Sequence, residues 1–401
     1  MKTDRISLKC LLTLVLPIWA LVPGGANPVA ADLSEFEIYP DDSILYRAYD
    51  GTINGRIPIR VFLCREEDRW EGSYFYKDRR MPLGLFDEVG VDETRDPQGQ
   101  GKVVLREGPM IGAEGTTGRW EGVFDDEARS FEGTWHSPDG MTAFPIELRE
   151  SSANDSLPAV FYRFSSSWTL ARGSIETRKE YSAVVIQFEG EDEPVRRINA
   201  TIRDAAANSF DSTDLPEPEP VIRRDGNPFA ALELAIRATP IDPEHLVPGL
   251  SGSDIQELVI QPVHNEGGYV TVRLYSRYYQ GGAHSNYTDH HLTFETATGR
   301  LLDLRRDILN PGYEEPLARA AEVQLRQTLG LEPGASLSAG PLDVDEIELN
   351  ENWFLTVGGI GFSHDPYEVA SFAVGFVSYV LPWEDLRPWL RERALRPLSG
   401  R

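Results

Sequence analysis

The chain has 401 residues, a formal net charge of −25, 41% hydrophobic residues and two cysteines. This apolar content is enough for ordinary packed cores, which argues against a wholly disordered chain. The negative charge repels phosphates and therefore disfavours nucleic acid as a partner. It would attract a basic partner, but an acidic surface also keeps an exported protein soluble, and we take solubility as the simpler reason for it.

Residues 1–31 have the pattern of a secretory signal peptide. A short basic start is followed by an apolar run over 11–22 and by small residues that end at Ala31. Pro17 interrupts this run, which is shorter than the ~20 apolar residues that span a bilayer. We expect an exported protein, periplasmic or extracellular, with no spanning segment after cleavage and a net charge of −27, because three basic residues and one acidic residue are removed. An uncleaved N-terminal anchor is the alternative.

After this cleavage Cys64 is the single cysteine of the chain. One cysteine excludes an internal disulfide framework and a cysteine-rich zinc site. Cys64 follows the apolar run at 59–63, so we predict that it is a small buried hydrophobic residue. The sequence indicates no cofactor, because it has no phosphate-binding loop, nucleophile elbow, dinucleotide-binding motif or HExxH motif.

Residues 32–150 are predicted to form an all-β domain. Short segments rich in β-branched and aromatic residues alternate with clusters of Gly, Asp and Pro. Three of these segments share an aromatic–Glu–Gly core that begins at Trp70, Trp120 and Phe131. Alternation along a strand places the aromatic ring and the glycine on one face and the glutamate on the other. The pattern predicts an antiparallel meander or small barrel whose aromatics lie in the core.

Residues 151–214 form a second predicted part with two strand-like segments, 168–178 and 182–190, followed by a helix. The helix is indicated by Val195, Ile198, Ile202 and Ala205, which recur at helical spacing. The proline- and acid-rich stretch at 215–228 is predicted to be a surface connection.

The predicted last part, residues 229–401, mixes helices with antiparallel strands, which makes the fold class α+β. Helices are expected at 229–238, at 313–329 (ending at Gly330) and at 383–395 (with Leu386, Leu390 and Ala394 on one side). Strands are expected at 257–265, 269–280, 352–363 and 372–382, and in a hairpin over 290–304 that turns at Thr298-Gly299.

Several segments of this last part resemble the RsiV-type C-terminal domain, a domain of unknown function in bacterial exported proteins. Residues 279–284, YQGGAH, resemble the family's Gly-Gly-Ala-His loop, and residues 294–302 resemble its next hairpin. Segments 352–355, 365–370 and 381–386 resemble its ending in order and spacing. The resemblance covers about residues 229–395. The region 151–214, with Ile198-Asn199, more faintly resembles the domain that often precedes this one in PdaC-like proteins.

The resemblance implies an exported recognition domain. One class of the family senses lysozyme by binding it and controls a sigma factor, and another accompanies a peptidoglycan deacetylase domain. This sequence shows neither a sigma-binding segment before a transmembrane helix nor a deacetylase domain with its Asp and His metal ligands. We therefore carry over neither activity.

The leading hypothesis is a non-enzymatic binding module of the cell envelope that recognises a protein or a cell-wall glycan. A basic lysozyme-like protein is the most specific partner, because opposite net charge speeds encounter. The glycine pair before His284 permits backbone torsions that other residues resist. The candidate binding residues are Tyr278, Tyr279, Gly281, Gly282, His284, Tyr287 and Tyr367.

The competing hypothesis is an envelope hydrolase or metal-dependent enzyme that uses His284 with His290 or His291 and Asp289. Adjacent residues on a strand point to opposite faces, so at most one of the two neighbouring histidines joins His284. Residues 364–366, His-Asp-Pro, are predicted to form a turn rather than a catalytic pair. A structural scaffold protein that docks through its strand domain is the third hypothesis.

Overall fold

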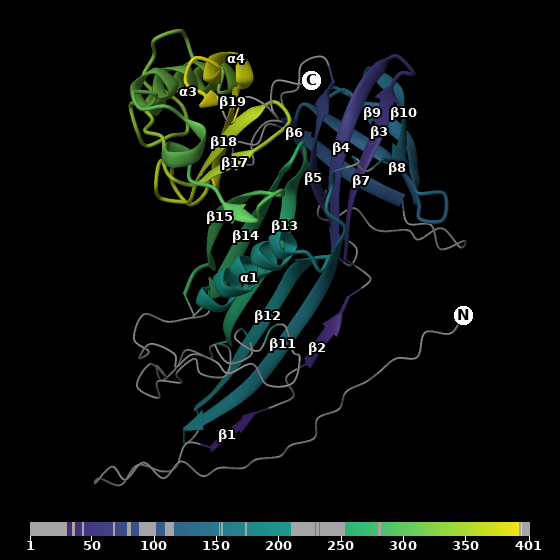
Figure 1. Ribbon diagram of the computed structural model, residues 1–401, viewed down its shortest axis with the longest axis vertical. Helices are drawn as coiled ribbons and strands as arrows, with labels where there is room; N and C mark the ends of the chain where they lie inside the picture. The colour runs from purple at the N-terminus through teal and green to yellow at the C-terminus, as the bar shows by residue number, and fades with distance from the viewer. Residues whose placement is uncertain are drawn as a thin grey trace.

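The computed structural model describes residues 30–33, 37–41, 44–66, 69–77, 82–87, 102–108, 116–151, 153, 155–172, 175–209, 229, 232, 253–279, 282–392 and 394. The predicted signal peptide except Ala30 and Ala31, the predicted connection at 215–228, and the predicted helix at 229–238 except Phe229 and Leu232 lie outside the described residues. Figure 1 shows three regions: a barrel, a long central sheet and a smaller C-terminal region of strands and helices.

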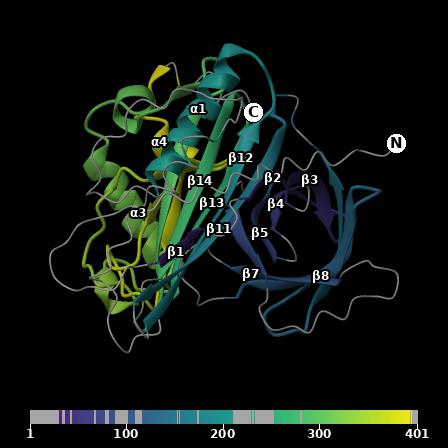
Figure 2. The same cartoon turned by 90° about the horizontal axis from the view of Figure 1, so that it is seen from below.

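An eight-stranded antiparallel barrel forms the N-terminal region, and the pairing of β3 with β10 closes it. Figure 2 shows its strands curving around a common axis, beside the central sheet. Its strands are β3 (Leu45–Ile53), β4 (Ile57–Glu66), β5 (Arg69–Tyr76), β6 (Pro82–Asp87), β7 (Lys102–Gly108), β8 (Gly118–Asp125), β9 (Ser130–His136) and β10 (Ala143–Glu150). Of the two predicted arrangements, meander or small barrel, the barrel is the one observed.

The interior of the barrel is packed with side chains around one buried carboxylate. Trp70, Trp120 and Phe131 are buried there as predicted. The carboxylate belongs to Glu107 and accepts four hydrogen bonds of 2.8 to 3.0 Å from neutral donors. The donors are the Tyr74 and Thr117 hydroxyls and the indole N–H groups of Trp120 and Trp135. A buried charge is tolerated only when such bonds replace water, so this network ties β5, β7, β8 and β9 together.

The central sheet has the strand order β1-β11-β12-β13-β14-β15-β16, with β2 also paired to β11. The pairing of β12 with β13 is parallel and joins strands of the predicted parts 151–214 and 229–401 in one sheet. Parallel neighbours need a long crossover, and α1 lies in this one. Within 229–401 the described strand pairs are antiparallel, as predicted. The strands are β1 (Ala30–Leu33), β2 (Glu37–Pro40), β11 (Ala159–Arg172), β12 (Ile175–Phe188), β13 (Ser253–Glu266), β14 (Tyr269–Tyr279), β15 (Asn286–Glu295) and β16 (Arg300–Leu301).

Helix α1 (Glu193–Asn208) packs on this sheet through its apolar face, as its spacing predicts (Figure 1). Asp192 caps it by accepting a hydrogen bond from the Val195 N–H. Asn199, buried on the same face, exchanges two side-chain hydrogen bonds with the backbone of Phe188 at the end of β12. Gly299 forms the predicted hairpin turn with φ +67° and lies so close to Pro194 that a Cβ atom would clash with its carbonyl oxygen.

The C-terminal region packs a three-stranded sheet against helix α3 around its own hydrophobic core. The strands are β17 (Trp353–Leu355), β18 (Gly359–His364) and β19 (Val377–Pro382). The other elements are η2 (Leu304–Ile308), α3 (Glu314–Thr328), η3 (Leu337–Ala339) and α4 (Trp383–Leu386). Helix α3 agrees with the predicted helix at 313–329, and Gly330 follows it with φ +66°.

The predicted closing helix at 383–395 is wrong in length, because α4 ends at Leu386. Pro388 has no backbone N–H, and Leu390 forms a bridge with Leu309 instead of continuing the helix. Leu386, Leu390 and Ala394 are nevertheless buried in one core, so the predicted apolar residues are right although the element is not. Over the described residues the fold is dominated by sheet, with few helices, and no described helix combines the length and apolarity needed to cross a bilayer.

The Glu107 network gives a stability test of the barrel. We expect Glu107→Gln to lower the free energy of unfolding by about 2 kcal/mol, because the amide nitrogen brings donors where four donors already converge. Urea unfolding followed by tryptophan fluorescence measures this loss. Glu147→Gln on the exposed face of β10 is the matched control and should change stability by less than about 0.5 kcal/mol. Equal effects of the two substitutions would contradict the assigned role.

Candidate functional site

The hairpin of β14 and β15 carries most of the predicted binding residues at its exposed end. Tyr278 pairs with Asn286 in the ladder and is exposed, and the Tyr279 hydroxyl donates a hydrogen bond of 3.1 Å to the Gly282 carbonyl oxygen. Gly282 has φ +112°, a torsion that favours glycine. Gly281 lies outside the described residues. The loop therefore returns the chain tightly before β15 begins.

Aromatic rings gather beside this loop. The His284 imidazole stacks on Phe372 at a centroid distance of 3.9 Å, and Tyr287 packs against both Phe372 (4.9 Å) and Phe376 (5.0 Å). Tyr367 approaches Phe372 at 5.9 Å. We call these five residues, His284, Tyr287, Tyr367, Phe372 and Phe376, the ring cluster. Three of them were predicted from the sequence, and the segment 367–376 supplies the two that were missed.

Tyr367 occupies a turn that normally requires glycine. Glu368 donates its backbone N–H to the Asp365 carbonyl oxygen, which closes the turn predicted at His364-Asp365-Pro366. Tyr367 is the third residue of this turn and has φ +72°, the torsion of a type II turn. Its side chain is 66% exposed. A bulky residue with positive φ is an outlier, so the fold holds this ring outward at a cost in backbone energy.

The four candidate metal ligands, His284, Asp289, His290 and His291, do not lie together: they are on opposite faces of β15 or in the loop before it. Asp289 and His291 are buried on one face of β15, whereas His290 is exposed on the other. His284 is exposed at the loop, where its Nδ1 lies 3.0 Å from the Ser285 carbonyl oxygen. Asp289 is engaged by an arginine, as described below. In the described part of the chain, no group of three or more His, Cys, Asp or Glu side chains is arranged to hold a metal ion.

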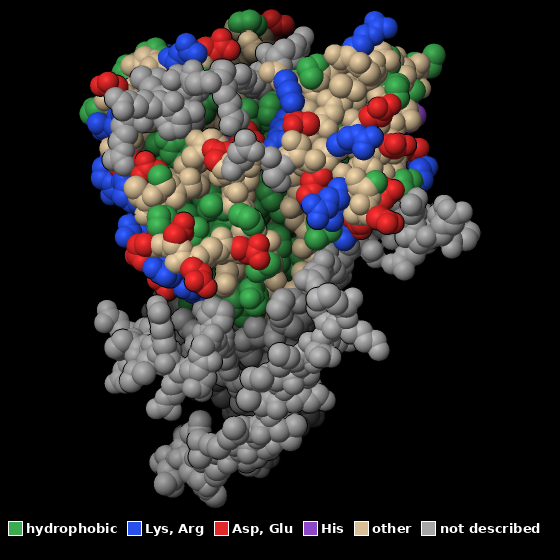
Figure 3. Space-filling view, turned by 45° about the vertical axis from the view of Figure 1, so that its right-hand side comes forward, with side chains coloured by type: hydrophobic (Ala, Val, Ile, Leu, Met, Phe, Trp, Pro, Cys, Tyr) green, Lys and Arg blue, Asp and Glu red, His purple; other side chains and the backbone are tan. Residues whose placement is uncertain are grey.

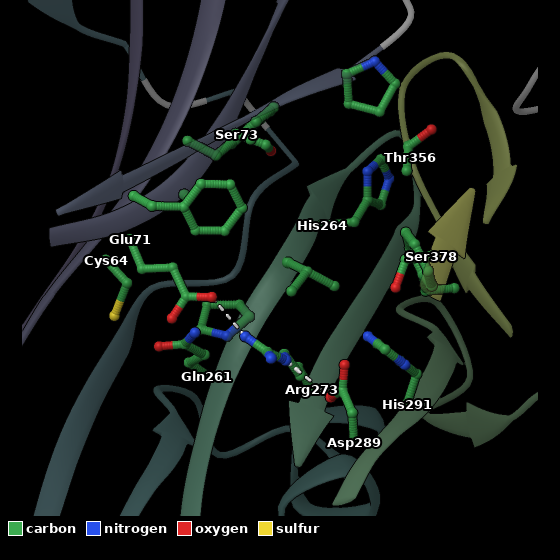
Figure 4. A pocket seen from close by; sticks show the side chains of 18 of the residues that line it. Cys64, Glu71, Ser73, Gln261, His264, Arg273, Asp289, His291, Thr356 and Ser378 are labelled. Carbon is green, nitrogen blue, oxygen red and sulfur yellow. Dashed lines mark hydrogen bonds and ion pairs between the residues drawn. The ribbon is translucent and has the colours of Figure 1, made fainter. Parts of the chain in front are cut away.

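A cavity of about 310 Å³ lies where the barrel, the central sheet and the C-terminal sheet meet. Figure 4 shows Glu71 and Cys64 from the barrel on one side, His264 and Arg273 from the central sheet in the middle, and Ser378 from β19 on the other. Cys64 is buried, as predicted. No local sequence pattern indicates this cavity, because its walls come from segments far apart in the chain.

Arg273 is the charged centre of this junction. Its Nη1 lies 2.6 Å from the Glu71 carboxylate on the barrel, and its Nε lies 2.8 Å from the Asp289 carboxylate on β15 (Figure 4). Burial lowers the pKa of the guanidinium, but the two carboxylates outweigh burial and the net shift is upward. Arg273 also lies over the rings of Tyr275 and Phe376, at 5.4 and 5.7 Å. It is therefore fixed as a cation between three regions of the fold.

A buried polar network continues from Asp289 into the C-terminal sheet. The Asp365 carboxylate accepts the Asp289 backbone N–H at 2.8 Å, and the Asn352 amide donates to the Asp289 carbonyl oxygen at 2.6 Å. Asn352 Oδ1 also accepts the His291 backbone N–H, and His291 Nδ1 lies 2.9 Å from the same oxygen. Because Oδ1 can only accept, Nδ1 carries the proton in this arrangement. Burial lowers the pKa of the His291 imidazole, which favours its neutral form.

Asp365 has a shifted carboxyl pKa. Burial raises this pKa to about 6, and the carboxylates of Glu368 and Asp289 add to the rise, while the hydrogen bond from the Asp289 N–H opposes it. The neighbouring His364 imidazole is buried, with Nδ1 3.3 Å from Glu368 and Nε2 3.4 Å from the Tyr379 hydroxyl. Burial also lowers the pKa of His364. The pair is turned into the fold and not toward the cavity, because neither residue lines it.

The C-terminal region is similar to a domain of unknown function. The model of the family described as "Protein of unknown function (DUF3298)" matches residues 306–384. A solved member of the DUF3298 family from Bacteroides fragilis has 16% identity and a TM-score of 0.46, and one from Pseudomonas aeruginosa PAO1 has 18% identity and a TM-score of 0.43. Each alignment covers 60% of this chain and 97% of the other. No curated protein matches the chain.

The pairing of Arg273 with Asp289 generates a stability prediction. Asp289 is only 5% exposed, so we expect Arg273→Met to destabilise the protein by about 3 kcal/mol by leaving a buried carboxylate unpaired. Glu71 is 47% exposed, and Glu71→Gln should cost less than about 1 kcal/mol. Chemical unfolding of both variants measures the difference. The double variant Arg273→Met/Asp289→Asn should recover part of the loss, and no recovery would contradict the charge argument.

The shifted pKa of Asp365 predicts a pH-dependent stability difference. The folded-state pKa of about 6 lies above the ordinary value of 3.8. The contribution of the Asp365 carboxyl to stability is therefore fully present below pH 3.8 and is lost as pH rises to about 6. Because the group is only half buried, we expect Asp365→Asn to stabilise the protein at pH 7.5 by only about 1 kcal/mol. The gain should vanish near pH 3.5. Exposed Asp343→Asn is the control, and a pH-independent gain for Asp365→Asn would contradict the assignment.

Proposed function

We propose that this protein is a non-catalytic, exported binding module of the cell envelope and that the ring cluster is its recognition face. The single observation that carries the proposal is Tyr367, which is 66% exposed and held at φ +72° beside Phe372, the ring on which His284 stacks. Aromatic side chains present a large contact area with few rotatable bonds, and they are enriched in recognition surfaces. Export is supported by the signal-like pattern at residues 1–31.

The backbone torsion of Tyr367 supports a functional role for its ring. Glycine or asparagine at this turn position would avoid a cost of about 1 kcal/mol. The exposed ring returns little burial energy to the fold to offset that cost. Strained residues that persist at exposed positions gather at ligand-binding sites. We infer that the ring is held outward to contact a partner.

A basic, lysozyme-like protein is the partner that these features favour. The chain carries a net charge of −25, and opposite charge accelerates the encounter with a basic protein. Figure 3 shows that acidic and basic side chains are interspersed over one face, so the attraction arises from the net charge and not from one acidic field on that side. The resemblance of residues 229–395 to the RsiV-type domain, one class of which binds lysozyme, points to the same partner.

Binding of a basic lysozyme to the purified protein tests the proposal. We expect binding at low ionic strength that weakens as salt rises, and a loss of about tenfold in affinity for Tyr367→Gly, which is about 1.4 kcal/mol of contact energy. The same substitution should raise the free energy of unfolding by about 1 kcal/mol, because it relieves the torsion at φ +72°. Isothermal titration calorimetry and urea unfolding measure the two effects.

Val323→Ser is the matched control, because Val323 is an exposed apolar residue on α3, outside the ring cluster. It should leave binding unchanged. Absence of lysozyme binding at low salt would end the lysozyme version of the proposal. Binding of soluble peptidoglycan fragments that is lost in Tyr367→Gly would identify a wall glycan as the ligand instead. If neither ligand binds, the recognition role of this face is wrong.

A further inference from the structure

We propose that the cavity between the barrel, the central sheet and the C-terminal sheet binds a small neutral amphipathic molecule with an apolar chain of about a dozen carbon atoms and a terminal hydroxyl group. This site differs from the ring cluster, since only Phe376 belongs to both. The size of the cavity, the residues that form its walls, and the charges that line it favour such a ligand.

The size of the cavity sets the size of the ligand. Its volume of about 310 Å³ is roughly twice the ~150 Å³ of an engineered protein cavity that stays dry and binds benzene. It also falls at the lower end of the ~300–1,000 Å³ range of small-molecule sites. A chain of about twelve carbons, twice the carbon content of benzene, is therefore the matching size.

The barrel contributes an aromatic wall from its outer surface. On β4, Val61 and Leu63 point into the barrel core, whereas Phe62 and Cys64 point outward to the cavity. Phe62 stacks on Phe75 of β5 at 6.2 Å, in a small apolar cluster separate from the barrel interior. An outward-facing apolar surface on a barrel requires cover from water. Here Tyr46 and Val357 pack against part of the cluster, and the cavity adjoins the rest of it.

The opposite wall comes from the C-terminal region. Phe354 of β17, Val357 of the following turn, and Phe376 before β19 line the cavity. His291 stacks on Phe354 at 4.6 Å, which fixes the plane of the imidazole. A partly open cavity with rings on both sides favours an apolar chain over a polar molecule, because such walls offer few hydrogen bonds to replace those with water.

The polar end of the cavity is electrically balanced. The cations of Arg273 and Arg106 are matched by the carboxylates of Glu71 and Asp289, all of which line the cavity. Arg273 already binds both carboxylates, so a further anion would compete with them for its guanidinium, and the Arg106 guanidinium lies over the Phe86 ring at 5.1 Å. A ligand with either charge would therefore upset the balance in a site of low polarity. A neutral head group is therefore the best match to this end of the cavity.

The His291 imidazole favours a hydroxyl group on the ligand. Its Nδ1 donates to Asn352, so Nε2 of the neutral ring is a hydrogen-bond acceptor. Because His291 lines the cavity next to Ser378 (Figure 4), an alcohol O–H is the complementary donor. A carboxylate has no proton to donate to this nitrogen, and an alkylammonium would add a buried positive charge beside Arg273.

The first experiment uses N-phenyl-1-naphthylamine, a neutral fluorescent probe, and displaces it from the purified protein with 1-dodecanol, dodecanoate or dodecylammonium. We expect 1-dodecanol to displace the probe at a concentration at least about tenfold lower than either ion, the equivalent of one hydrogen bond plus charge compensation. Absence of probe fluorescence overturns the proposal. Displacement by dodecanoate as effective as that by 1-dodecanol overturns the neutral head group.

A cavity-filling variant locates the bound probe. Val357→Trp should reduce probe binding at least tenfold, whereas Val323→Trp on the exposed face of α3 should leave it unchanged. Circular dichroism and thermal unfolding establish that both variants are folded. Equal probe binding by the two variants would place the probe elsewhere and overturn the proposal. Tyr367→Gly serves as a further control, because Tyr367 does not line the cavity.

Cys64 gives a readout that requires no filling variant. With Cys10 replaced by serine, Cys64 is the remaining cysteine and lines the cavity. We expect saturating 1-dodecanol to slow the reaction of Cys64 with N-phenylmaleimide at least fivefold. The thermal unfolding temperature should not fall, which would show that the protein stays folded. An unchanged reaction rate at a saturating concentration overturns the proposal even if Val357→Trp does not fold.

Discussion

The arrangement of the three regions depends on one largely buried cation, whose side chain is 16% exposed. Arg273 on β14 reaches Glu71 on the barrel and Asp289 on β15, and Asp289 in turn lies 3.4 Å from the Ser363 hydroxyl on β18. A second arginine, Arg60 on β4, pairs with Glu266 on β13 at 3.1 Å and supports the same junction. Charges at such a junction must be paired to be tolerated, so the barrel, the central sheet and the C-terminal sheet share one relative placement.

The hairpin of β14 and β15 connects this junction to the ring cluster. Arg273 lies over Phe376, and Phe376 packs against Tyr287, so cation and rings form a continuous set of contacts. The middle of the hairpin is thus held by the ion pair of Arg273 with Asp289, and its loop end contacts the rings of the ring cluster. A hairpin fixed along its length by packing and hydrogen bonds is suited to present a preorganised surface at its loop.

The barrel contributes to the junction of the three regions through its outer face. Its interior is filled by aromatic side chains around Glu107, as small eight-stranded barrels commonly are, so its interior is a packed core. Its outer face supplies Phe62, Phe75 and Glu71 to the junction. The closed barrel makes this face rigid, and rigidity preserves a cavity that would otherwise collapse to recover lost contacts.

The sequence alone determined the features that depend on local periodicity: the inward aromatics beginning at Trp70, helices α1 and α3, the turn at Gly299 and the burial of Cys64. It also indicated His284, in the loop before β15, and Tyr367, after β18, as candidate binding residues. Only the tertiary structure decided the closure of the barrel by β10, the parallel pairing of β12 with β13, and the bridge from Leu309 to Leu390 that replaces the closing helix.

Arg273 shows why the junction could not be read from the sequence. Its place between Val272 and Leu274, both buried, indicates by strand alternation only that Arg273 points to the opposite face of the sheet. Its partner Glu71 lies 202 positions away in the chain, and Phe372 contacts His284 across 88 positions (372 − 284). Periodicity reports which face of an element is apolar, but a pairing between distant segments is set by how those faces pack together in three dimensions.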